Sequence, residues 1–314
     1  MKRGIVLATL VVAGALSAVV GAYQQPANPP AQRVVEVEKL RENLFVLRGG
    51  GGNTAVFVTT NGVVVVDTKN PGWGQPILDK IKELTNKPVT TIINTHTHGD
   101  HVSGNVEFPP TVDVVTHENT AANMKAMRSV TGFKPQPNSA NIFETSKGVG
   151  LPKRTFKDTM TIGSGSDQVD VYYFGRGHTN GDAWIVFPTL RVMHAGDIFS
   201  GKNLPLLDAN NGGSGLEIGN TLAKAHSGVK GVESIITGHS TVMTMADLKE
   251  YADFNREFAQ FVQDGKKAGR SPSQIAEGWK LPDKYKGYAS TLDKEGKPIP
   301  RILTNVEVIF DEIK

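Results

Sequence analysis

The sequence reads NTHTHGDH at residues 94–101, directly after a hydrophobic run typical of a buried strand. In an extended segment, residues two apart point to the same side, so His96 and His98 can converge on one ion. If the chain then turns at the glycine, Asp100 and His101 can face a second point nearby. Polar groups gathered at a strand end must be hydrated, paired or bound to a metal. The cluster therefore predicts a metal site.

Further side chains of ligand type follow other predicted strands, each after a glycine. They are His178 after the strand 169–174, Asp197 after the strand 191–194, and His239 after the strand 234–237. Loops that leave one edge of a sheet can assemble a site in this way. Five of the eight histidines are thereby placed in one predicted centre.

The remaining periodicity predicts mixed α and β structure, of the α/β or α+β class. The apolar runs 55–59 and 63–67 read as two strands that flank Asn61-Gly62, a sequence that favours a type I′ turn. Apolar residues at helical spacing begin at residue 76 and again after Thr244. The sequence at Thr244 resembles a capping box, which marks the start of a helix.

Residues 1–22 are typical of a secretory signal peptide, with a basic start, an apolar run and a small residue at the cleavage position. A membrane anchor is the competing reading, but a spanning helix needs about 20 apolar residues. Residues 23–33 are polar and proline-rich and predict a flexible linker. One domain over residues 34–314 follows, with C-terminal helices from about residue 244. We expect a periplasmic or secreted protein that has no membrane association after cleavage.

The amino-acid composition excludes several kinds of reactive and metal site and disfavours one class of partner. The 314 residues contain no cysteine, which excludes thiolate nucleophiles, iron–sulfur clusters and disulfides. Loss of Lys2 and Arg3 with the signal peptide leaves 32 basic and 31 acidic residues, a net charge of +1. This near balance disfavours nucleic acid as a partner and leaves a small-molecule substrate as the expectation.

Taken together, these motifs resemble the metallo-β-lactamase-fold superfamily, whose signature is HxHxDH followed by further His, Asp and His ligands. The resemblance implies a four-layer αβ/βα sandwich with a binuclear site on one edge. It also implies two ligand sets: His96, His98 and His178 for the first ion, and Asp100, His101 and His239 for the second, with Asp197 bridging both. Asp67, at the end of its hairpin strand, would orient the histidine loop without binding metal.

Nitrogen and oxygen donors suit two zinc ions and also admit iron or manganese. Zinc lowers the pKa of bound water to about 7, which supplies a hydroxide that attacks a carbonyl carbon. We therefore expect an exported zinc hydrolase of an ester, thioester, lactone or β-lactam, with Asp100 and Asp197 as its catalytic carboxylates.

Departures from subfamily patterns leave alternatives open. The chain lacks the cysteine of one lactamase group and carries Asp197, which the cysteine-free group lacks, although export favours a β-lactamase proper. Glyoxalase II-like thioesterases usually have a histidine where Asp182 stands, and flavodiiron proteins have a glutamate where His98 stands. A mononuclear iron enzyme resembling sulfur dioxygenases and a non-catalytic metal-binding protein are the remaining alternatives.

Other polar residues are weaker candidates. Asp182 is expected to support a ligand, and His194 is expected to face the sheet interior or a residue that supports a ligand, rather than a metal. Specificity is expected to lie in the segments 128–155 and 203–215. The second of these offers three residues as substrate contacts: Asp208, Asn211 and Ser214.

Overall fold

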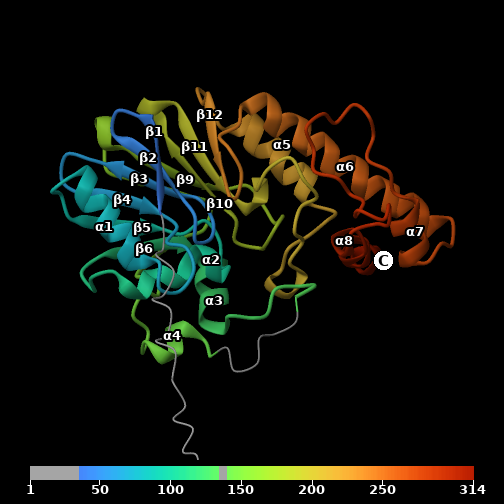
Figure 1. Ribbon diagram of the computed structural model, residues 1–314, viewed down its shortest axis with the longest axis horizontal. Coiled ribbons are helices and arrows are strands. Elements are labelled where there is room, and N and C mark those ends of the chain that lie inside the picture. Colours follow the sequence, from blue (N-terminus) through green and yellow to red (C-terminus); the bar gives the residue numbers. More distant parts are fainter. Residues whose placement is uncertain (1–34, 134–139) are drawn as a thin grey trace, which may run out of the picture. The chain divides into compact units, whose positions relative to one another are not determined.

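The structure is a computed structural model that describes residues 35–133 and 140–314 (Figure 1). The chain forms two units with the boundary after Gln32, and every described residue belongs to the second unit, Arg33–Lys314. The predicted signal peptide and linker, residues 1–22 and 23–33, lie outside the described residues and stay predictions. Within the described part, no helix is both long and apolar enough to cross a bilayer.

Seven strands of the described chain form the first sheet, in the order β1 to β7. Their bounds are Glu36–Arg41, Leu44–Arg48, Thr54–Val58, Val63–Val66, Val89–Ile93, Asp113–His117 and Arg154–Phe156. β1 to β4 pair antiparallel, and from β4 to β7 the neighbours are parallel. Helix α1 (Gly74–Leu84) makes the crossover from β4 to β5 that a parallel pair requires. The carboxyl ends of β4 and β5 therefore meet at one edge.

The second sheet has the order β12-β11-β10-β9-β8 among the described residues. In chain order, the bounds of β8 to β12 are Thr159–Ile162, Val169–Tyr173, Ala183–Phe187, Val192–Gly196 and Ser234–Thr237. β10 pairs antiparallel with both β9 and β11, while β11 and β12 are parallel. β9, β11 and β12 thus run in one direction, and the three loops predicted to carry ligands leave the sheet at the same edge.

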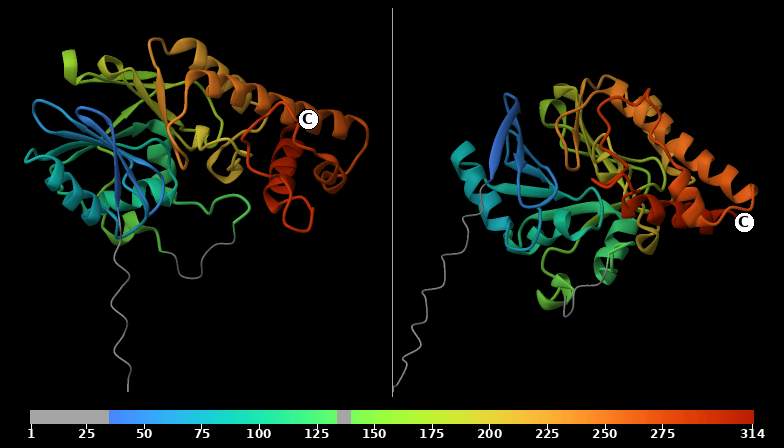
Figure 2. Two further views of the ribbon diagram at one scale, coloured as in Figure 1. Left: turned by 45° about the horizontal axis from the view of Figure 1, so that its top comes forward. Right: turned by 45° about the vertical axis from the view of Figure 1, so that its right-hand side comes forward.

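Side-chain alternation explains the layers. All four valines of β4 are buried, with Val64 and Val66 in the core between the sheets and the other two in the core beneath α1. β10 repeats this arrangement, because Ile185 faces the first sheet and Trp184 faces the C-terminal helices. Figure 2 shows α1 and α6 on opposite outer sides of the paired sheets. The predicted four-layer αβ/βα sandwich is confirmed.

The other α-helices of the described chain are α2 (Gly99–Val102), α3 (Glu118–Ala126), α4 (Ile142–Thr145), α5 (Ile218–Gly228), α6 (Met245–Lys267), α7 (Pro272–Gly278) and α8 (Pro300–Glu312). α6 begins with the predicted capping box, in which Thr244 Oγ1 accepts a hydrogen bond from the Asp247 N–H at 3.2 Å. α8 is fixed to the loop after β11, since Asn305 Nδ2 donates to the Pro205 carbonyl at 2.8 Å.

The hairpin predicted over residues 55–67 forms, but its turn differs from the one expected. A four-residue loop, 59–62, joins the strands, and the Thr59 N–H donates to the Gly62 carbonyl at 2.8 Å. Asn61 and Gly62 are absent from the described residues with positive φ, so the prediction of a type I′ turn is wrong. A loop of this length closes the hairpin without the mirror-image backbone that a two-residue loop requires.

Candidate metal centre

The histidine loop leaves the carboxyl end of β5 and enters α2. His96 and His98 lie two residues apart in this loop, and both are buried. His98 has an extended backbone (φ −65°, ψ 144°) at the start of α2. The turn expected at the following glycine is thus a short helix, and that helix carries Asp100 and His101.

The second sheet supplies the other predicted ligands from its matching edge. His178 lies in the loop between β9 and β10, Asp197 directly follows β11, and His239 lies two residues beyond β12. All seven predicted ligands fall into groups whose possible ligand atoms lie within 4.8 Å of one another. The centre therefore joins residues from both sheets.

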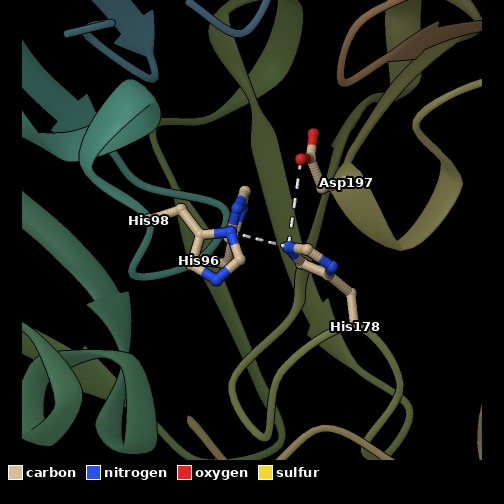
Figure 3. Close-up of side chains that lie close together, drawn as sticks. All are labelled: His96, His98, His178 and Asp197. Carbon is tan, nitrogen blue, oxygen red and sulfur yellow. Dashed lines mark hydrogen bonds and ion pairs between the residues drawn. The ribbon is translucent and has the colours of Figure 1, made fainter. Parts of the chain in front are cut away.

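The first group consists of His96, His98, His178 and Asp197, all buried. Figure 3 shows the three imidazoles pointing toward one another, with the carboxylate beside His178. His98 Nδ1 lies 3.0 Å from His178 Nε2. His178 Nε2 also lies 3.9 Å from Asp197 Oδ2.

Hydrogen bonds at the outer ring nitrogens determine which atoms face inward. His98 Nε2 lies 2.7 Å from Asp208 Oδ2 and donates to it, and His178 Nδ1 donates to the Leu206 carbonyl at 2.6 Å. A neutral imidazole that donates from one nitrogen has a lone pair on the other. The two inward nitrogens therefore present lone pairs to each other at 3.0 Å. This contact is repulsive when both rings are neutral, and either a proton on one ring or a metal ion held by both relieves the repulsion.

His96 has an inward nitrogen with no hydrogen-bond partner. Thr95 Oγ1 donates to Asp67 Oδ2 at 2.7 Å, so it accepts from His96 Nδ1 at 2.9 Å. His96 Nε2 is buried and unpaired among the described residues. A buried polar atom without a partner costs about 1–3 kcal/mol. Metal ligation removes that cost, so these donors fit a divalent ion.

The second group consists of Asp100, His101 and His239. Asp100 Oδ2 lies 3.2 Å from His239 Nε2. Asp197 contacts this group as well, since its Oδ1 lies 3.2 Å from His101 Nε2 and its Oδ2 lies 3.2 Å from His239 Nε2. The Asp197 carboxylate lies between the two groups, which is where a bridging ligand would stand.

Asp67 holds the histidine loop in place. Its carboxylate accepts from the Thr95 N–H at 2.8 Å and from His101 Nδ1 at 2.7 Å. His101 Nε2 is consequently the nitrogen that faces the second group. Asp67 has φ 62°, a left-handed conformation that few non-glycine residues adopt. Such strain persists where surrounding contacts demand it, and it clusters at functional sites.

Burial and neighbouring charges set the pKa values of the ligands. Burial lowers the pKa of His96 well below its usual value and that of His178 to about 4. Both imidazoles are neutral and keep a lone pair for a cation. At His101, burial lowers the pKa, but the carboxylates of Asp197 and Asp100 outweigh it and raise the pKa well above the usual value. The carboxylate pair thus concentrates negative potential at the second group.

A cavity of about 980 Å³ opens over both groups. Its lining includes His98, Asp100, Asp197 and His239. The segment 127–133, Leu206 and the first turn of α8 form its walls. The cavity therefore gives a substrate access to both groups of ligands.

Three residues expected to contact substrate lie behind the site instead. Asp208, Asn211 and Ser214 are buried, and none lines the cavity as the described residues form it. Asp208 accepts from His98, and Ser214 Oγ accepts a backbone N–H at the start of α5. We correct the expectation accordingly. Asn211 Nδ2 in turn donates to Asp208 Oδ2 at 2.6 Å, so these buried side chains of the segment 203–215 contact one another and the protein backbone rather than the cavity.

Asp182 supports a ligand only indirectly. Its carboxylate accepts from the Thr179 N–H at 2.9 Å and from Thr179 Oγ1, and so fixes the turn that follows His178. Burial raises the pKa of Asp182 to about 7. His194 faces the sheet interior as expected, with its Nε2 3.1 Å from the Asn53 carbonyl.

Two residues near the centre were missed by sequence reasoning. Lys69 is fully buried, and its Nζ donates to the carbonyls of Leu47 and Gly52 at 2.9 and 2.7 Å. Arg301, in the first turn of α8, lines the cavity. Neither follows a strand and a glycine, so the pattern that located the ligands carries no signal for them.

Comparison with known proteins agrees with this geometry. The family model of the metallo-beta-lactamase superfamily matches residues 47–253, which include all seven predicted ligands. The chain belongs to the metallo-beta-lactamase superfamily. Membership of this superfamily and the His/Asp groups support a divalent metal site and a metal-dependent, hydrolase-type function.

Two relatives within the metallo-beta-lactamase superfamily cover about half of the chain. Metallo-beta-lactamase type 2 from Elizabethkingia meningoseptica is 27% identical over 176 residues, 52% of this chain and 62% of that protein. The 2,4-dinitroanisole O-demethylase subunit alpha from Nocardioides sp. (strain JS1661) is 26% identical over 168 residues, 52% of this chain and 46% of that protein. The chain thus spans less than two thirds of the length of either curated relative.

Solved structures of the superfamily share the fold. A metallo-beta-lactamase from Pontibacter korlensis superposes with a TM-score of 0.58 at 20% identity, covering 71% of this chain and 99% of that one. A double mutant of the sec-alkyl sulfatase PisA1 superposes with a TM-score of 0.67 at 15% identity, covering 88% of this chain and 50% of that one.

Proposed function

We propose that the chain is a binuclear zinc hydrolase that acts on a small carbonyl substrate, namely an ester, thioester, lactone or β-lactam. The facing lone pairs of His98 Nδ1 and His178 Nε2, 3.0 Å apart, carry the proposal. They create a cation site directly beside a second group of ligands. When bound, zinc ions supply Lewis acidity that activates water near neutral pH and polarises a carbonyl group.

The chain's own residues would hold and orient the reactants. His96, His98 and His178 would hold one ion, Asp100, His101 and His239 the other, with Asp197 shared. The Asp100 side chain is 31% exposed and lines the cavity, so its carboxylate can orient a water molecule at the cavity floor. Apolar walls at Val130 and Leu206 limit access of bulk water to the reacting groups.

Metal content is the first test. Plasma mass spectrometry on protein purified without chelators or added metal should give two zinc ions per chain. One iron ion, together with oxygen consumption, would overturn the proposal in favour of a mononuclear iron oxygenase. Turnover of β-lactams well above that of simple esters would narrow the activity to a β-lactamase proper.

Single substitutions test the assignment of the ligands. His178→Ala and Asp100→Ala should each remove most of the ester, lactone or lactam hydrolysis while leaving the circular dichroism spectrum unchanged. His226→Ala, on α5 and outside both groups, is the matched control and should behave as wild type. A ligand variant that binds two ions and turns over normally would contradict the assignment.

We also propose that the protein is exported to the periplasm or secreted and that it acts on a small molecule rather than on nucleic acid. The signal-like composition of residues 1–22 and the near-balanced charge of the remaining chain support this. N-terminal sequencing of protein from the periplasmic fraction should find a start at Tyr23. An uncleaved chain in the cytosol would contradict export.

A further inference from the structure

Building on the hydrolase function proposed above, we propose that the substrate is an amphiphilic anion and that Arg301 binds its anionic group. The group is a carboxylate or a sulfo group carried on an apolar body. Arg301 lines the same cavity as Asp100, Asp197 and His239, and its side chain is partly buried there.

Arg301 is one of two described arginines without an ion pair or a side-chain hydrogen bond to a described residue, and the other, Arg270, lies over the Phe261 ring at 5.5 Å. Arg176, Arg191 and Arg256 each form a close ion pair, with Glu217, Glu233 and Asp253 respectively. Arg301 makes no ion pair and no side-chain hydrogen bond with any residue in the described ranges. Arg301 is thus a cavity-lining arginine whose donors have no acceptor among the described residues.

The position of Arg301 does not serve the stability of α8. It is the second residue of the helix, where the helix dipole is positive, and the first turn contains no acidic residue. A cation at this end is disfavoured. The helix itself is held rigidly, since Asn305 Nδ2 donates to the Pro205 carbonyl at 2.8 Å and Glu312 accepts from the Leu216 N–H at 3.0 Å. An unpaired charge is thus presented to the cavity by a fixed element.

The rest of the lining selects an apolar body. Val130, Phe133 and Leu206 line the cavity, and Phe133 is 58% exposed. A second guanidinium, that of Arg128, also lines the cavity, and its partner is the neutral Asn123 Oδ1 at 3.1 Å. Within the described lining, the acidic side chains are those of Asp100 and Asp197, which belong to the ligand groups.

An arginine fork matches the geometry of a carboxylate or sulfo group through two parallel hydrogen bonds. An apolar-walled cavity that contains Arg301 therefore favours a long anion over a neutral ester of equal length. Arg301 lies beyond residues 47–253, which the superfamily model matches. The proposed anion site thus lies outside the matched residues.

Kinetics with paired substrates test the role of Arg301. The metal-loaded enzyme is given 4-nitrophenyl pentanoate, which is neutral, and mono-4-nitrophenyl glutarate, which carries a carboxylate. In Arg301→Gln the KM for the anionic ester should rise by about 10- to 100-fold, while kinetics on the neutral ester stay within about twofold. Arg301→Lys should recover only part of the loss, because an ammonium group cannot form the fork. Arg256→Gln, on α6, is the control and should change neither substrate.

Calorimetry gives a readout that does not depend on turnover. The metal-free and metal-loaded proteins are titrated with 4-phenylbutanoate, with the corresponding sulfonate and with the uncharged amide. Both anions, or the preferred one of the two, should bind more tightly than the amide, and Arg301→Gln should abolish the difference in both forms.

The outcomes separate the two proposals. Arg301-dependent anion binding without turnover of either ester would overturn the hydrolase function and leave the anion site standing. Normal turnover of the neutral ester with equal affinity for acid and amide would overturn the anion site and leave the hydrolase function standing.

Discussion

Replacement of Asp208 by asparagine should weaken metal binding at the first group while leaving the fold intact. Asp208 is fully buried, and its Oδ2 accepts from His98 Nε2 at 2.7 Å and from Asn211 Nδ2 at 2.6 Å. Its Oδ1 accepts from the N–H and the hydroxyl of Thr131 at 3.0 and 2.9 Å. Asparagine has one acceptor oxygen, so its amide nitrogen must face a donor on one side or the other.

The magnitude follows from the hydrogen bond to the ligand. A hydrogen bond to a charged group contributes about 1.5–3 kcal/mol, and loss of a residue that orients a metal-bound histidine typically costs about 10- to 100-fold in metal affinity. The two ranges agree, because each tenfold change equals about 1.4 kcal/mol. We therefore expect zinc affinity at the first group to fall by about 10- to 100-fold in Asp208→Asn.

The assay is competition for zinc with a chromogenic chelator, followed in parallel by circular dichroism. Asp182→Asn is the matched control, because Asp182 is equally buried but accepts from Thr179 and not from a ligand. Its zinc affinity should stay within about threefold of wild type. If Asp208→Asn binds both ions as tightly as wild type, then Asp208 does not fix the His98 ring and the reasoning fails.

Three further predictions concern backbone clearance, metal removal and pH. A Cβ on Gly238 would collide with Asp197 Oδ1, so Gly238→Ala should lower the rate of ester hydrolysis at least tenfold. Gly278→Ala is the control and should keep the wild-type rate, because its Cβ would meet only ordinary contacts at 3.6 Å. Equal rates in the two variants would contradict the collision. Excess chelator should lower the unfolding temperature by about 10 °C, because a metal ion at a free concentration of about 1,000 times its Kd stabilises a protein by about 4 kcal/mol. An unchanged calorimetric midpoint would show that bound ions do not stabilise the contact between the two sheets. Burial lowers the pKa of Lys69 to about 7, so between pH 7 and about 10 the unfolded chain binds more protons and stability rises with pH by at most about 1.4 kcal/mol per unit. Urea unfolding at pH 7.5 and 9.5 should show this rise in wild type and lose it in Lys69→Met, and identical slopes would argue against a neutral Lys69.

The sheet edges could be predicted from the sequence because chain direction places their loops. His178, Asp197 and His239 each follow a predicted strand, and the three strands run in one direction in the second sheet. Strand ends that share a direction lie at one edge, so local sequence was sufficient to group these ligands. The grouping of His96 with His98 rested on a different local rule, because side chains two residues apart in an extended segment point to the same side.

Side chains in irregular segments could not be predicted in this way. Asp208 was expected to face substrate, because its loop follows Asp197 closely enough in the sequence to lie over the site. The structure turns it inward, because His98 Nε2 and the Thr131 backbone need acceptors. Arg301 reaches the cavity through the packing of α8 against the loop that contains Pro205. Such long-range packing leaves no periodic trace in the sequence.

The predicted ligands and part of the cavity wall come from different parts of the chain. Every predicted ligand falls within residues 47–253, while α8 begins at Pro300. With Arg301 as the proposed anion site, mutations in this helix should alter which molecules the protein binds without disturbing the predicted ligands. A chimera that exchanges only the C-terminal helices between related enzymes should transfer substrate preference while each parent keeps its own ions. In such a protein, a new substrate preference can arise from mutations in the C-terminal helices, while the metal ligands stay unchanged.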